Sequence, residues 1–138
     1  MRLRREKKIL EWTQYLGYYY ATPKAWLNET VESGMSVGMC LDHRGVVRVK
    51  KLFPGNSVSI FVKPPSINEL KARMEKRCLE TDPKEIQRRL LLAKKEIQRG
   101  QAYDVTIMNS NMSSAIRELK RIVKQHLKSR GGADAHSS

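Results

Sequence analysis

A short apolar run and a helix start follow each other directly in Ile60-Phe61-Val62-Lys63-Pro64-Pro65-Ser66-Ile67-Asn68-Glu69-Leu70. Four of the five residues from Val58 to Val62 are apolar, which predicts a short strand buried on both faces. Pro64 and Pro65 end that strand, because proline has no N–H to donate to a sheet. Ser66, with Glu69 three residues later, forms a capping box that opens a helix. The segment therefore predicts one α/β unit.

The residues that follow predict a second capped helix. The helix from Ser66 is expected to end near Cys78, and a loop covers 80–83. Asp82, Pro83 and Glu85 form a further capping box with proline at the first helical position. The helix is expected to close at Gly100, and its apolar stripe is Ile86, Leu90, Ala93 and Ile97.

The C-terminal part predicts a strand and one more helix. A strand over 103–108 ends at Asn109. An amphipathic helix follows, and its predicted apolar stripe is Ile116, Leu119, Val123 and Leu127. The small polar residues of 129–138 predict a disordered tail.

The N-terminal part predicts a helix fragment, a hairpin and a further strand. Residues 1–12 favour a basic helix, and the aromatic residues around Gly17 favour a hairpin. Thr22 and Pro23 are expected to cap and begin a helix that ends at Gly34. Residues 36–42 predict a buried strand that ends at Asp42, residues 45–51 a short helix, and residues 54–56 a turn. Strands that alternate with helices indicate an α/β fold with a parallel sheet and right-handed crossovers.

The composition suits one basic domain. The chain has 138 residues, and 27 Lys and Arg against 14 Asp and Glu give a net charge of +13. This excess favours polyanionic partners such as nucleotides or nucleic acid, although charge runs are more often solvated helix faces. Cys40 and Cys78 have neither metal-ligand nor disulfide-framework spacing. We therefore expect no metal site and a reducing cytoplasm. No apolar run approaches the roughly 20 residues that span a bilayer, so no membrane partner is expected.

The order of several short motifs resembles the guanylate kinase family from about Leu10 to Leu127. The motifs are Leu10-Glu11-Trp12, Gly17-Tyr18-Tyr19-Tyr20-Ala21-Thr22-Pro23, Asp42-His43-Arg44-Gly45, Val58-Ser59-Ile60-Phe61, Pro64-Pro65-Ser66, residues 73–77, Arg88-Arg89-Leu90, and Tyr103-Asp104 through Asn109. Each motif alone is weak, but their order and spacing are specific. The resemblance implies part of a P-loop-kinase-like parallel sheet flanked by helices. It further implies a remnant of the GMP-binding subdomain at 1–35, a kinase core at 36–128 with a lid segment at about 76–90, and the tail at 129–138.

The resemblance also implies a reaction, the transfer of a phosphoryl group from ATP to GMP with Mg²⁺. Guanine presents two N–H donors on one edge, and a carboxylate offers two acceptors. The positions that match GMP contacts of the family are Glu11, Tyr20, Thr22 and Asp42. Arg77 and Arg89 match lid arginines that clamp the transferring phosphoryl group, and Asn109 matches an asparagine near the ATP site.

Each matched residue also has an ordinary structural interpretation. Glu11 suits a solvated carboxylate, Thr22 an N-cap, and the tyrosines half-buried hairpin packing. Arg89 and its neighbour Arg88 suit a solvated helix face. Asp42 is harder to dismiss, because an acid at the end of a buried strand needs a partner.

The chain departs from the family in its phosphate-binding loop. The sequence contains no Gly-x-x-x-x-Gly-Lys-Ser/Thr, the loop that supplies backbone N–H groups, a lysine and a magnesium ligand. The N-terminal Ser-Arg-Arg set that grips the GMP phosphate is absent too. We therefore expect at most residual activity, and a chain truncated at its N-terminus.

The departure also affects the sheet and the choice of function. In the family, the strand before the phosphate loop lies between the strands that match 36–42 and 57–63. Without it, these two strands must pair directly or leave exposed edges, which favour a complementing chain or a homo-oligomer. Two alternative functions are a non-catalytic nucleotide- or protein-binding module and, supported by charge alone, a nucleic-acid-binding protein.

Overall fold

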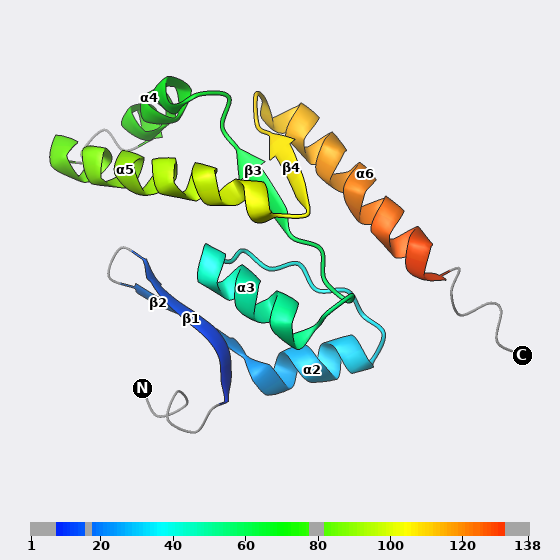
Figure 1. The fold of residues 1–138 in the computed structure, drawn as a ribbon. Helices are drawn as coiled ribbons and strands as arrows, with labels where there is room; N and C mark the ends of the chain where they lie inside the picture. Colours follow the sequence, from blue (N-terminus) through cyan, green and yellow to red (C-terminus); the bar gives the residue numbers. More distant parts are fainter. Residues whose placement is uncertain (1–7, 16–17, 78–81, 132–138) are drawn as a thin grey trace, which may run out of the picture. The chain divides into compact units, whose positions relative to one another are not determined.

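The computed structural model describes residues 8–15, 18–77 and 82–131. They form two compact units that divide between Ser57 and Val58 (Figure 1). The first unit holds β1 (Ile9–Tyr15), β2 (Tyr18–Pro23), α2 (Lys24–Glu32) and α3 (His43–Leu52). The second holds β3 (Ile60–Lys63), α4 (Ile67–Arg77), α5 (Pro83–Arg99), the short 3₁₀ helix η1 (Gly100–Ala102), β4 (Val105–Met108) and α6 (Met112–Gly131).

The first unit is organised by an antiparallel hairpin of β1 and β2. The predicted hairpin is confirmed, while its expected turn at Gly17 lies outside the described residues. The helix predicted over 1–12 is wrong from Ile9 onward, because these residues pair with β2; residues 1–7 lie outside the description. The register shifts between Ile9 and Glu11, and Leu10 at this irregularity is only 1% exposed.

The helix after the hairpin begins later than predicted. Thr22 lies in β2, Pro23 is the N-cap, and Lys24 is the first helical residue. The expected Thr22 cap is therefore wrong, because the strand pairing of Thr22 with Glu11 continues to this point. The predicted end is close to the observed one: Ser33 is the C-cap, and Gly34 follows with φ 81°, a conformation that glycine adopts without steric cost.

The strand predicted over 36–42 is wrong. Val37, Met39 and Leu41 are half-buried and the residues between them are exposed, which is the alternation of an extended segment. The segment nevertheless pairs with no strand in the described part of the chain. Of the two arrangements expected for this segment, direct pairing with 57–63 does not occur in the described part of the chain, where β3 pairs with β4 alone.

The second unit is built on a parallel pair, which confirms the predicted α/β fold with parallel strands. Ile60 pairs with Val105 and Lys63 with Met108. The junction before the strands is fixed by Asp104, whose Oδ2 accepts from the backbone N and the Oγ of Ser59, each at 2.7 Å. The expected burial of β3 on both faces is wrong, since Val62 is 51% exposed.

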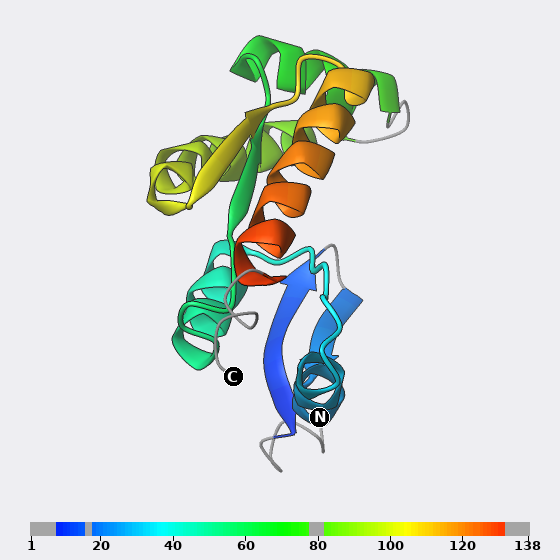
Figure 2. The same cartoon turned by 90° about the vertical axis from the view of Figure 1, so that its right-hand side faces the viewer.

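Helices lie on both sides of this strand pair, with α4 and α5 on one side and α6 on the other (Figures 1 and 2). The predicted N-cap residues of α4 and α5 are confirmed: Ser66 Oγ accepts from Glu69 N at 3.0 Å, and Asp82 Oδ1 accepts from Lys84 N at 2.9 Å. The stripe predicted for α5 is the less exposed side of the helix, with Ile86 buried.

The core of the second unit corrects the stripe predicted for α6. Ile107 of β4 clusters with Ala115 and Ile122 of α6, and Ile60 and Val105 pack against them. The predicted stripe residues are instead 40–50% exposed: Ile116, Leu119, Val123 and Leu127. The apolar residues of α6 cover a wide side of the helix. Those at one edge of that side, Ala115 and Ile122, pack on the sheet, and those in its middle are exposed.

Two boundaries also differ from the expected ones. The expected division at 35/36 falls inside the first unit, because α3 packs against β1. Helix α6 continues to Gly131, past the expected start of the tail at 129, and residues 132–138 lie outside the description. None of the described helices combines the length and apolarity needed to cross a bilayer.

Candidate functional site

The hairpin brings three candidate residues of the first unit onto neighbouring positions. Glu11 is the register partner of Thr22, and Thr13 is the register partner of Tyr20. Opposed residues of an antiparallel pair share a face, and so do residues two apart on one strand. By register, Glu11, Tyr20 and Thr22 therefore fall on one face of the hairpin, although Glu11 and Tyr20 lie nine positions apart in sequence.

The fourth candidate of this unit, Asp42, is the N-cap of α3. Its Oδ1 accepts from the backbone N of Gly45 at 2.8 Å, and its Oδ2 lies 4.0 Å from Nε of Arg44, whose side chain is 93% exposed. The side chain of Asp42 is 27% exposed. The carboxylate of Asp42 thus has a backbone N–H at the start of α3 as one of its partners.

Asn109 lies directly after β4 in the second unit. Its backbone N donates to the carbonyl of Lys63 at 2.8 Å, which continues the parallel pairing one residue past the strand. Residues that follow the carboxyl ends of parallel strands are where open α/β sheets bind ligands. The position of Asn109 therefore suits a ligand contact.

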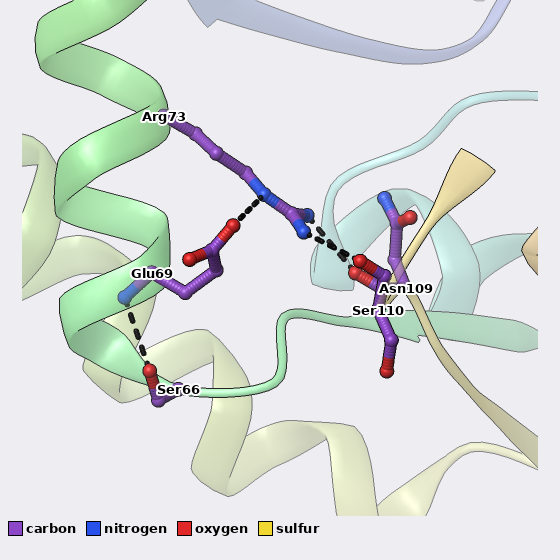
Figure 3. Close-up of polar contacts among 5 residues, drawn as sticks. All are labelled: Ser66, Glu69, Arg73, Asn109 and Ser110. Carbon is purple, nitrogen blue, oxygen red and sulfur yellow. Dashed lines mark hydrogen bonds and ion pairs between the residues drawn. The ribbon is translucent and has the colours of Figure 1, made fainter.

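Sequence reasoning missed Arg73 of α4 as a member of this region. Its Nη1 donates to the carbonyl of Asn109 at 2.9 Å and its Nη2 to the carbonyl of Ser110 at 3.0 Å. Its Nε also donates to Oε1 of Glu69 at 2.8 Å. Figure 3 shows the guanidinium between the carboxylate of Glu69 and the two carbonyls, with the side-chain amide of Asn109 directed away from it. One arginine thus connects α4 to the turn between β4 and α6.

The two predicted lid arginines belong to packed helices of the same unit. Arg77 is the last residue of α4 and is exposed, while the side chain of Arg89 on α5 is 20% exposed. Helices α4 and α5 pack against each other. Cys78 and the rest of the connection, residues 78–81, lie outside the described part of the chain.

Glu85 forms ion pairs with two arginines of α5, Arg88 and Arg89. Its carboxylate pairs with Nε of Arg88 at 2.9 Å and with Nε of Arg89 at 3.1 Å. The hydrogen bonds from Arg88 and then Arg89 lower the pKa of Glu85 below its ordinary value of 4.5. At neutral pH the carboxylate is therefore ionised, and Arg89 is oriented along α5.

The donor groups on hand suit phosphate oxygens better than a metal ion. In the described residues, no group of three or more His, Cys, Asp or Glu side chains could hold a metal ion. The sequence also contains no phosphate-loop Ser or Thr that would bind Mg²⁺. Among the described residues, Arg77 and Arg89 carry the planar donors that match phosphate geometry.

The parallel strand pair between helices defines an α/β protein. Residues 1–126 match the family described as guanylate kinase. The chain belongs to the guanylate kinase family.

Individual relatives agree with this assignment. The chain is 39% identical to the guanylate kinase of Bacillus subtilis over 124 residues, which are 89% of this chain and 60% of that protein. It is 38% identical to the guanylate kinase of Streptococcus thermophilus over 121 residues, 87% of this chain and 56% of that protein. The crystal structure of guanylate kinase from Anaplasma phagocytophilum superimposes with a TM-score of 0.73 at 27% identity, covering 90% of this chain and 58% of that one. The chain thus spans less than two thirds of the length of these relatives.

Proposed function

We propose that the chain binds GMP through its first unit and carries the ATP-side residues of phosphoryl transfer in its second, with at most residual transfer by itself. The membership of residues 1–126 in the guanylate kinase family supports this reading most strongly. The common hairpin face of Glu11, Tyr20 and Thr22 supports it independently, because residues that bind one ligand must lie near one another.

The proposed GMP contacts follow from the chemistry of guanine. Glu11 accepts the two N–H donors of the guanine edge, and Thr22 offers a hydroxyl beside it. Tyr20 donates its hydroxyl to the GMP phosphate. Asp42 is the proposed second acidic contact to GMP.

The proposed ATP-side residues neutralise charge that spreads over phosphate oxygens. Arg77 and Arg89 bind the transferring phosphoryl group through charge-assisted hydrogen bonds. Asn109 contacts ATP at the carboxyl end of β4. When bound with ATP, Mg²⁺ would neutralise charge on the phosphates, and the phosphate-loop residue that ligates it in the family is not in this sequence.

The missing loop sets the expected rate. Phosphoryl transfer depends on positioning and electrostatic stabilisation, and the phosphate loop supplies much of both. The sequence contains no such loop, so the chain alone is expected to bind nucleotide more effectively than it transfers phosphate. Its cysteine content also favours a reducing compartment, and we assign the chain to the cytoplasm on that basis.

Calorimetry with GMP, AMP and inorganic phosphate tests the guanine site. We expect weak binding with GMP preferred over AMP, because adenine offers no matching pair of N–H donors, and an acceptor that the ligand covers without pairing costs roughly 1–3 kcal/mol. Glu11→Gln should remove the preference. Glu29→Gln on the exposed face of α2 is the matched control and should retain it.

The same calorimetry separates this proposal from the two alternatives, a nucleic-acid-binding protein and a non-catalytic binding module. Equal affinity for GMP and AMP, unchanged by Glu11→Gln, would contradict the guanine site. The charge of +13 would then favour a nucleic-acid binder, whose affinity falls steeply with salt. GMP preference that persists in the complete absence of phosphoryl transfer would instead identify a non-catalytic binding module.

A further inference from the structure

Two neighbouring arginines of α5 differ in how far solvent reaches them. The side chain of Arg88 is 68% exposed, whereas that of Arg89 is 20% exposed. Arg89 lies four residues after Glu85 and three after the buried Ile86, so all three share the less exposed side of the helix. A solvated helix face therefore describes Arg88 and does not describe Arg89.

The carboxylate of Glu85 connects the two arginines. Nε of Arg88 lies 2.9 Å from Oε2, and its Nη2 donates to Oε1 at 3.1 Å. Arg88 thus contacts both oxygens, a two-point contact that sets the direction of the carboxylate. Nε of Arg89 donates to Oε1 at 3.1 Å. The contact with Arg88 therefore places the oxygen that Arg89 uses.

This contact changes what Arg89 must lose when it binds an anion. A long, flexible side chain gives up rotamer freedom on binding, which opposes the complex. The contact with Glu85 removes part of that freedom beforehand. Both side chains are at least three-quarters covered, so water screens this pair less than it screens an exposed pair. The ion pair therefore pre-orders the guanidinium of Arg89.

A carboxylate beside an arginine also has an opposite effect on a polyphosphate. Its negative charge repels the phosphates, and it competes with them for the guanidinium. In this cluster the charge of Glu85 is balanced by Arg88 through the two-point contact. The three side chains together keep one positive charge, and Arg89 carries it. The balance therefore favours ordering over repulsion.

We propose that Glu85 is a positioning residue for Arg89: it orders the guanidinium before the phosphate chain of ATP arrives, while Arg88 balances its charge. Glu85 itself makes no contact with the nucleotide in this proposal. The inference deepens the proposed function and rests on it, because it requires Arg89 to bind phosphate.

Calorimetry of the full chain with ATP tests the role of Glu85. Glu85→Gln keeps the shape of the side chain and removes its charge. It should weaken ATP binding by about fivefold, since a charge-assisted hydrogen bond is roughly twice as strong as a neutral one. Repulsion alone predicts the opposite sign, a tighter complex. Glu96→Gln removes the same charge at an exposed position of α5 and should not weaken binding.

A double variant separates positioning from a loss of structure. Arg89→Met should weaken ATP binding by at least about tenfold. Adding Glu85→Gln to that variant should cause no further loss, because Glu85 acts on ATP through Arg89. A further loss would show that Glu85 supports the fold instead, and would overturn the proposal. Circular dichroism verifies that each variant is folded during the titration.

Nuclear magnetic resonance of the Nε–H group of Arg89 gives a readout that needs no nucleotide. The proton should exchange slowly with water in the unsubstituted chain and faster in Glu85→Gln, because the charged acceptor is lost. The Nε–H signal of Arg73, which donates to Glu69, should keep its rate in both proteins. An unchanged rate at Arg89 would show that Glu85 does not order it, and would overturn the proposal.

The single variants distinguish this inference from the proposed function. If Arg89→Met weakens ATP binding and Glu85→Gln does not, the positioning role is overturned and the ATP contact of Arg89 stands. If Arg89→Met leaves the ATP affinity unchanged, the ATP contact itself is wrong, and the positioning role is overturned with it.

Discussion

At the scale of single residues, Gly100 of the second unit leaves no room for a side chain. It is buried at the end of α5, and a Cβ placed on it would overlap the ring of Phe61 on β3. The same ring lies 5.3 Å from the ring of Tyr103, centroid to centroid. Glycine is therefore needed here for space, because it lets the end of α5 pack closely on β3, and not for an unusual backbone angle.

Gly100→Ala is predicted to destabilise the chain. The new methyl group must displace Phe61 or shift the backbone, and overpacking of this kind costs about 1–3 kcal/mol. Denaturant unfolding measures the difference. Gly38→Ala is the control, since nothing lies within 4 Å of a Cβ placed at that position, and it should change stability far less.

Glu85 is predicted to make stability depend on acid pH. Its folded pKa lies below the ordinary 4.5 because Arg88 and then Arg89 donate to it. The stabilisation is thus complete above pH 4.5 and is lost as the pH falls through the lower folded pKa. In denaturant unfolding, the stability difference between the unsubstituted chain and Glu85→Gln should shrink below pH 4.5. Glu75→Gln on exposed α4 serves as the matched variant. If its stability difference changed equally with pH, the acid dependence could not be attributed to Glu85.

At the scale of elements, the contact of Arg73 ties α4 to the turn after β4. It joins residues 36 and 37 positions apart in sequence, and it fixes the carbonyls on either side of the Asn109–Ser110 peptide. The contact therefore links α4 to the strand end that carries Asn109.

Arg73→Met should lower stability by about 1 kcal/mol, the net worth of a typical lost hydrogen bond, because the side chain is itself 36% exposed. It should also speed amide hydrogen exchange in residues 109–115. Lys71→Met provides the comparison, since the Lys71–Glu75 pair is 3.7 Å apart and more than half exposed, and surface pairs contribute little. Unchanged exchange in Arg73→Met would contradict the linking role.

The elements that sequence predicted well are those whose signals are local. Ser66 and Asp82 cap their helices through residues two or three positions away, so a short motif contains the whole interaction. The strand at 36–42 and the buried side of α6 depend on distant partners, which a local pattern does not contain. Arg73 was missed for the same reason: its nearest sequence partner is Glu69, an ordinary helix pair, and its carbonyl partners are remote.

At the scale of the whole molecule, the candidate residues come from both units. Periodicity indicated an α/β fold, and the net charge of +13 indicated a polyanion partner. The specific residues came from the family resemblance, because residue type and spacing alone do not single them out: Glu11, Tyr20, Thr22, Asp42, Arg77, Arg89 and Asn109. Their roles as nucleotide contacts remain predictions.

The full chain alone is predicted to have at most residual GMP kinase activity. The missing phosphate loop removes backbone donors and a lysine that stabilise the transition state. A coupled assay with ATP, Mg²⁺ and GMP measures the turnover. A value within about tenfold of the common enzyme range of roughly 1–1,000 per second would show that other residues replace the loop.

The parallel pairing of β3 with β4 also has a consequence for the order of folding. Ser59 and Asp104 lie 45 positions apart, so this pairing must wait until α4 and α5 have been synthesised and have brought the two strands together. The β1–β2 hairpin closes over a few residues, and hairpins form in roughly 1–10 μs. During synthesis the hairpin can therefore close while β3 still lacks β4, and a nascent β3 is exposed on both of its edges until the last third of the chain has left the ribosome.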